Sequence, residues 1–143
     1  MNRMEAPSEA GRSMVVLVVE DEEVVRGFIK HSLEENGYVV LTARNSVEAL
    51  HLGASYYGPI DVLLMDVAMK IFQNGMELAS CFSLMRPETN VILTSGSGLP
   101  EEFSDFVQTW SFLPKPFSQW QLLKIVGLNS HWESTVECVR DIL

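Results

Sequence analysis

Three carboxylates directly follow two strongly apolar runs of the chain. Glu20 and Asp21 come after the run MVVLVV, and Asp66 comes after IDVLLM. Carboxylates that lie close together repel one another and raise each other's pKa unless a cation neutralises them. A hard divalent ion that prefers oxygen ligands, Mg²⁺ or Mn²⁺, meets this need. If the two runs end side by side, these residues predict a divalent-cation site.

A hydroxyl group and an ammonium group follow two further apolar runs. Thr94 comes after NVIL, and Lys115 follows the short run SFL with one proline between them. Opposite a divalent cation, these groups can neutralise and hydrogen-bond the equatorial oxygens of a phosphoryl group in transfer. Any one of the five residues is ordinary at a strand end, where the chain emerges into water. All five together, in this order, predict a phosphoryl-acceptor site.

The apolar runs are typical of strands that alternate with amphipathic helices. MVVLVV is a continuous β-branched run without polar alternation, as expected for a strand covered on both faces. The segment after it has apolar residues at helical spacing and stops at Asn36 and Gly37, a C-terminal cap signal. The predicted strands are residues 14–19, 38–42, 60–65, 90–93 and 111–113. The predicted helices are residues 22–36, 47–57, 76–85, 100–110 and a last helix that begins at the capping box of residues 118–121.

Two of these helices carry more detailed signals. Ser46 is available to cap the second helix. In the first helix, one apolar stripe is formed by Val24, Val25, Phe28, Ile29 and Leu33. This spacing predicts an amphipathic helix.

Five strands alternating with five helices predict an α/β fold with a doubly wound, five-stranded parallel sheet. In such sheets, ligands bind outside the carboxyl ends of the strands, near the switch in strand order. The five polar residues all follow strand ends, so this fold would bring them together.

Composition limits the class of protein. With 143 residues, of which 47% are hydrophobic, the chain can bury one core but is too short for two ordinary domains. Its net charge of −9 repels a phosphate backbone and argues against nucleic-acid binding. No run of about twenty apolar residues is present to cross a bilayer. Cys81 and Cys138 lack the spacing of metal or redox motifs, which favours two reduced thiols and a cytoplasmic location.

The two ends of the chain differ from the middle. Residues 1–13 are polar and include Pro7, Ser8 and Gly11, so we expect a disordered leader. Residues 14–128 form the predicted domain. Residues 129–143 begin with a capping box, and their apolar stripe predicts an extra C-terminal helix; the stripe consists of Trp132, Val136, Val139 and Leu143.

Four stretches of the chain resemble the signatures of response regulator receiver domains, which have a flavodoxin-like fold. These stretches are VLVVEDEE, LLMDVAM, VILTSG and FLPKPF, and the resemblance covers roughly residues 14–128. It implies that Asp66 is the phosphoacceptor and that Thr94 and Lys115 bind the phosphoryl group. Mg²⁺ would be held by Glu20, Asp21, Asp66 and the main-chain carbonyl of Ala68.

The resemblance also implies a partner and an output. A histidine kinase or a histidine phosphotransfer protein would supply the phosphoryl group from a phosphohistidine, and the chain would catalyse only its own phosphorylation and dephosphorylation. Thr94 and Phe112 would act as the switch pair. An aromatic surface of Trp110, Phe112 and Trp120 would contact a downstream protein, or a second copy through the last helices. We expect a stand-alone response regulator that signals by protein contact or by phosphorelay.

The sequence departs from the family pattern after Asp66. Met69 and Lys70 stand where the family usually has an apolar residue followed by proline, and the longer loop resembles receivers attached to hybrid histidine kinases. Lys70 permits an alternative, a receiver-like interaction module that does not need phosphate. A doubly wound enzyme is disfavoured because the first turn has no glycine-rich phosphate loop. Ala68 also stands where aspartyl-phosphate hydrolases need a second aspartate.

Overall fold

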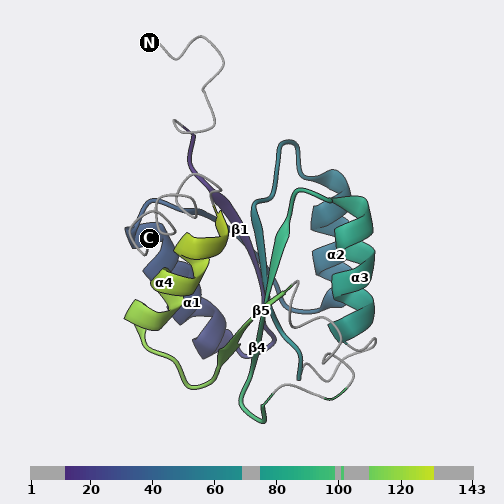
Figure 1. The fold of residues 1–143 in the computed structure, drawn as a ribbon. Helices are drawn as coiled ribbons and strands as arrows, with labels where there is room; N and C mark the ends of the chain where they lie inside the picture. Colours follow the sequence, from purple (N-terminus) through teal and green to yellow (C-terminus); the bar gives the residue numbers. More distant parts are fainter. Residues whose placement is uncertain (1–11, 69–74, 99–100, 102–109, 131–143) are drawn as a thin grey trace, which may run out of the picture.

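The computed structural model describes residues 12–68, 75–98, 101 and 110–130, and the structural statements below concern these residues. Five parallel strands form one sheet in the order β2-β1-β3-β4-β5 (Figure 1). The strands are β1 (Val15–Val19), β2 (Val39–Ala43), β3 (Val62–Asp66), β4 (Asn90–Ser95) and β5 (Ser111–Pro114). The predicted doubly wound, five-stranded parallel sheet is confirmed.

Four α-helices in the described part of the chain cover the two faces of the sheet. They are α1 (Glu23–Glu35), α2 (Ser46–Ser55), α3 (Gly75–Met85) and α4 (Gln119–Ser130). Helices α1 and α4 lie on one face, and α2 and α3 lie on the other (Figure 1). Because both faces are covered, every residue of β1 and β3 is buried, as the continuous apolar runs predicted.

The sheet separates two hydrophobic cores. Alternate residues of β1 point to opposite faces, so Leu17 belongs to one core and Val18 to the other. The core under α2 and α3 includes Met65, Phe82 and Leu93. The core under α1 and α4 includes Ile29, Leu33, Leu64, Leu122 and Val126. Each helix pair therefore depends on the same central strands.

One local prediction was wrong. The cap of α2 is Asn45, whose side chain accepts a hydrogen bond from the Glu48 N–H at 2.9 Å. Ser46 instead starts the helix, and its buried Oγ has no hydrogen-bond partner in the described structure. In α1 the predicted stripe is only partly buried: Ile29 is covered, but Val24 is 84% exposed. The stripe is therefore wider than the face of α1 that the sheet covers.

Several predicted segments lie outside the described residues. These are residues 1–11 of the leader, most of the helix at 100–110, the loop at 69–74 that contains Lys70, and the extension at 131–143. Arg12, which we assigned to the leader, is described, and it forms a bidentate ion pair with Asp61 at 3.0 and 2.7 Å. None of the helices that the structure describes has the length and apolar character needed to cross a membrane.

Candidate functional site

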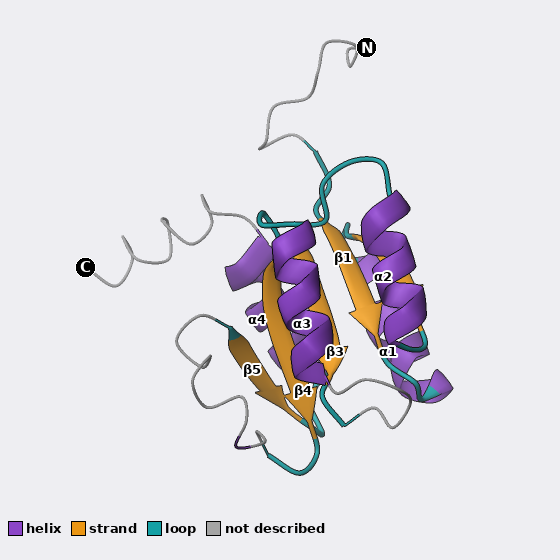
Figure 2. Ribbon diagram, turned by 90° about the vertical axis from the view of Figure 1, so that its right-hand side faces the viewer, coloured by secondary structure: helices purple, strands orange, loops and turns teal. Residues whose placement is uncertain are grey.

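The carboxyl ends of the strands meet at one edge of the sheet, where the arrowheads point in Figure 2. Glu20 and Asp21 follow β1, and Asp66 is the last residue of β3. In the parallel register, Asp66 pairs with Thr94 of β4. One carboxylate oxygen from each of Glu20, Asp21 and Asp66 lies within 4.8 Å of the others. The predicted carboxylate cluster is therefore assembled by the sheet itself.

Lys115 reaches this acidic cluster from the end of β5. Its backbone N–H donates to the Ser95 carbonyl at 2.9 Å, which fixes the start of the side chain beside β4. Its Nζ lies 2.8 Å from Glu20 Oε1 and 2.9 Å from Asp66 Oδ2. One ammonium group thus joins carboxylates from two different strands.

Backbone N–H groups hold the other oxygens of the same two carboxylates. The Glu22 N–H donates to Glu20 Oε2 at 3.1 Å, and the Ala68 N–H donates to Asp66 Oδ1 at 2.9 Å. A carboxylate oxygen has two lone pairs, so each still has room for a cation or another donor. The carboxylates are oriented from both sides before any ligand arrives.

Burial and pairing shift two pKa values at the site. Burial raises the pKa of the Glu20 carboxyl, and hydrogen bonds from Lys115 and Glu22 offset only part of that effect. Burial acts to lower the pKa of the Lys115 ammonium, but the hydrogen bonds to Glu20 and Asp66 outweigh it, so this pKa is raised. Lys115 therefore stays protonated at neutral pH.

The acidic cluster has the chemistry of a site for a hard divalent cation. Three carboxylates converge, and among the described residues only the Lys115 ammonium forms ion pairs within the cluster. One ammonium cannot balance three carboxylates, and oxygen ligands are those that Mg²⁺ prefers. Glu20, Asp21 and Asp66 therefore fit this ion.

Thr94 is buried directly beside Asp66. Its Oγ1 lies 3.4 Å from the Met65 carbonyl, to which it donates, and its own carbonyl accepts from the Val67 N–H at 2.9 Å. The side chain is near the acidic cluster but is bonded to the backbone of β3. In this conformation the hydroxyl is not hydrogen-bonded to the carboxylates, and movement toward Asp66 would break only one long bond.

The three aromatic residues of the predicted partner surface do not share one face. Trp110 is buried in the core under α2 and α3, and Phe112 packs against the same core. Trp120 lies on α4 on the other face, 67% exposed, with Lys124 Nζ 4.8 Å from its ring centroid. Because α4 covers the opposite face of the sheet, Trp120 is separated from the other two. The partner-surface role of these residues stays a prediction.

Sequence reasoning missed one residue that supports the site. Arg26, in the first turn and a half of α1, donates from Nη1 to the main-chain carbonyl of Glu20 at 2.9 Å. It thereby anchors the turn between β1 and α1. The available signal was a single arginine among acidic and apolar residues, which also fits an ordinary solvated position. The Glu22 and Ala68 N–H donors had no sequence signal because every residue except proline has such a group.

Comparison with known proteins adds a family match. A family model described as the response regulator receiver domain matches residues 16–127. The sensor kinase CckA of Brucella abortus is 32% identical over 131 residues, which cover 87% of this chain and 13% of the kinase. The transcriptional regulatory protein CpxR of Escherichia coli is 29% identical over 82% of this chain, which spans 50% of CpxR. The chain thus spans half or less of these two relatives.

A solved structure shows the same fold. The receiver domain from the hybrid histidine kinase CckA is 30% identical and superposes with a TM-score of 0.70. The match covers 82% of this chain and 99% of that domain. The likeness therefore extends over nearly all of the described sheet and helices.

Proposed function

Because the chain belongs to the response regulator receiver domain family, we propose that it accepts a phosphoryl group on Asp66 in a Mg²⁺-dependent reaction. The donor would be a phosphohistidine of a histidine kinase or a histidine phosphotransfer protein. The observation that carries the proposal is the convergence of three carboxylates with Lys115 around Asp66. This arrangement supplies an acceptor oxygen, a cation site and a fixed positive charge within one cluster.

In the proposed reaction, a carboxylate oxygen of Asp66 attacks the phosphorus atom in line with the leaving imidazole. The N–P bond breaks, and its electron pair stays on the ring nitrogen. The Ala68 N–H holds Asp66 in place, and Lys115 neutralises negative charge that develops on the phosphoryl oxygens. Mg²⁺ held by Glu20, Asp21, Asp66 and the Ala68 carbonyl would supply further charge neutralisation.

The proposed output starts with Thr94. Phosphorylation would place new acceptor oxygens beside β4, and the Thr94 hydroxyl would exchange its 3.4 Å bond to Met65 for a phosphoryl oxygen. Phe112 is half-buried on the neighbouring strand, so a shift of β4 would alter its packing. Signal would then pass to a downstream protein by contact or by phosphorelay.

The direct test is phosphorylation of the purified chain by acetyl phosphate, followed by intact mass. We expect the wild type to gain one phosphoryl group only when Mg²⁺ is present, and Asp66→Asn to gain none. Glu34→Gln is the matched control, because this carboxylate is exposed on α1 and paired with Lys30. It should behave as the wild type does. A wild type that stays unlabelled at every Mg²⁺ concentration would favour the phosphate-independent module instead.

A further inference from the structure

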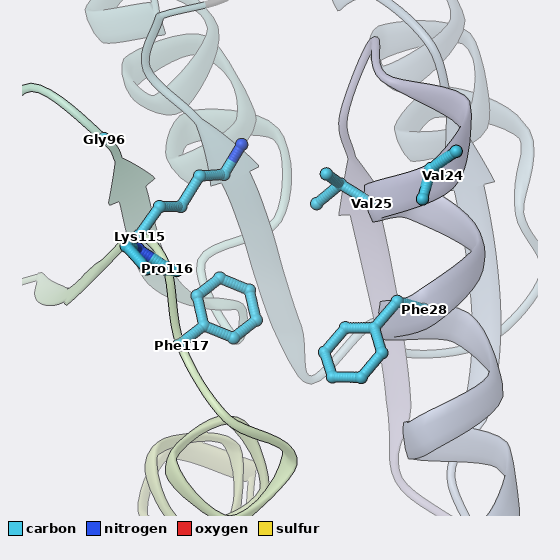
Figure 3. Close-up of a pocket in the computed structure, with 7 residues that line it drawn as sticks. All are labelled: Val24, Val25, Phe28, Gly96, Lys115, Pro116 and Phe117. Atoms are coloured by element: carbon cyan, nitrogen blue, oxygen red, sulfur yellow. The ribbon is translucent and has the colours of Figure 1, made fainter.

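A groove with apolar walls lies between α1 and the residues that follow β5 (Figure 3). Its volume is about 580 Å³. We call it the α1–β5 groove and define it by Val24, Val25, Phe28, Phe117 and the aliphatic stem of Lys115. In Figure 3 the ring of Phe117 lies opposite that of Phe28, and Val25 lies opposite the Lys115 side chain.

The apolar walls are exposed to solvent. Val24 is 84% exposed and Phe28 is 43% exposed. The rings of Phe28 and Phe117, which both line the groove, are 6.4 Å apart between centroids and tilted by 42°. Exposed apolar side chains gathered in a hollow mark a binding surface more often than scattered ones do. The groove therefore has the character of a site for an apolar group.

The groove is continuous with the phosphoryl-acceptor site. The stem of Lys115 forms part of its wall, and the ammonium at the end of that stem lies 2.9 Å from Asp66 Oδ2. Gly96 directly follows β4 and also lines the groove. Because it has no side chain, it does not block the space between the groove and Asp66. A molecule whose phosphoryl group approaches Asp66 can thus place its remaining part in the groove.

We propose that the α1–β5 groove binds the leaving group of the phosphodonor and selects donors whose leaving group is a flat apolar ring. This inference rests on the proposed function and adds a substrate preference to it. The single cation of the groove, Lys115, complements the phosphoryl end, and the apolar walls complement the ring. Glu22 and Glu23 are exposed at the start of α1 beside these walls and disfavour a leaving group with an additional anionic substituent.

The reaction with such a donor balances without another reactant. For benzoyl phosphate, an oxygen of Asp66 forms a bond to phosphorus while the bond between phosphorus and the benzoate oxygen breaks. Benzoate leaves with the electron pair, and Asp66 carries the phosphoryl group. Acetyl phosphate reacts by the same bond changes with acetate as the leaving group. The two donors differ in the ring that the groove would hold and in the basicity of the leaving carboxylate, so the contribution of the groove is the part of the rate ratio that changes in groove variants.

The first experiment compares the rates at which benzoyl phosphate and acetyl phosphate label Asp66, measured by intact mass at equal Mg²⁺. We expect benzoyl phosphate to react about tenfold faster, which corresponds to partial burial of one ring. Phe28→Ala and Val24→Ser should each lower this rate ratio about threefold. Leu84→Ala is the matched control, because Leu84 is 86% exposed on α3, on the other face of the sheet. It should leave the ratio unchanged.

The second experiment measures binding without transfer and is independent of phosphorylation. Phenylphosphonate should shift the amide resonances of residues 24–28 and of Phe117, whereas methylphosphonate should shift only residues around Asp66 and Lys115. Equal labelling rates for the two donors, or a ratio that Phe28→Ala does not change, would overturn the proposal. If neither donor labels Asp66, the proposed function fails, and an absence of phenylphosphonate shifts at the groove would then reject the ring site separately.

Discussion

At the scale of single residues, the site is held together by one shared ammonium group. Lys115 bonds to Glu20 and Asp66, while backbone N–H groups hold the other oxygen of each carboxylate. These hydrogen bonds do not fully compensate for the burial of the Glu20 carboxyl. Glu20 is only 1% exposed, and burial raises its pKa more than the hydrogen bonds lower it. Ionised Glu20 therefore costs folding free energy until a cation arrives.

This cost predicts a pH-dependent effect of Glu20→Gln. Because the pKa of Glu20 is raised in the folded state, folding favours the protonated form of this carboxyl. The stability that this form contributes is fully present below the ordinary glutamate pKa and is lost as pH rises through the raised pKa. In metal-free buffer, the variant should therefore be more stable than the wild type at neutral pH. The difference should vanish in acid. Urea unfolding across a pH series measures it, and a difference that grows toward low pH would contradict the argument.

The residues of the site were predictable from the sequence, but their contacts were not. Parallel strands share one direction, so Asp66 and Lys115 had to emerge at the same edge once the alternation was recognised. The contact of Lys115 with Glu20 depends on the conformation of two long side chains from strands far apart in the chain, for which no sequence pattern exists. Arg26 was missed for the same reason.

At the scale of elements, α2 and α3 approach closely because Gly53 has no side chain. A Cβ atom at this position would lie 2.7 Å from Phe82 Cε2 and 2.8 Å from Met85 Cε. The Met85 side chain can move, but Phe82 is fully buried in the core under α2 and α3. The spacing of this helix pair is thus set by one glycine.

We expect Gly53→Ala to destabilise the protein by about 1 to 3 kcal/mol, because overpacking outweighs the better helix propensity of alanine. Gly27→Ala on α1 is the matched control, since no atom lies within 4 Å of a Cβ added there. That change should stabilise by up to about 1 kcal/mol. Thermal unfolding of both variants gives the comparison, and equal shifts in midpoint would refute the packing argument.

Element boundaries were the less predictable part of the fold. Asn45 and Ser46 are both good caps, and only the extended backbone at Asn45 decides which of them binds the Glu48 N–H. Likewise, the periodicity of α1 could not distinguish the buried Ile29 from the exposed Val24. Helical spacing shows which apolar residues share a face of the helix, but it does not show which of them the sheet covers.

At the scale of the whole molecule, a single ligand bound at the acidic cluster would contact groups from several strands of the sheet. Its carboxylates come from the ends of β1 and β3, and Lys115, which pairs with two of them, follows β5, so these groups span most of the sheet. Binding of a divalent cation to the folded state alone would therefore stabilise the entire domain and not one loop.

We expect Mg²⁺ at one hundred times its dissociation constant to raise the free energy of unfolding by about 2.7 kcal/mol. Because a net charge of −9 is also screened by salt, the control is NaCl at equal ionic strength. Asp21→Asn should remove most of the Mg²⁺-specific part. A response to NaCl as large as the response to Mg²⁺ would show general screening instead of a site.

Both ends of the described domain lie at the edge of the sheet opposite the acidic cluster. Near the first end, Arg12 forms an ion pair with Asp61, which directly precedes β3. Near the other end, Asn129 of α4 accepts hydrogen bonds from Asn90 and Ser111, the first residues of β4 and β5. A tether, fluorophore or solid support attached at either point would leave the reactive edge facing outward. The domain is accordingly suited to immobilisation as a sensor, in which Asp66 stays accessible to donors in free solution.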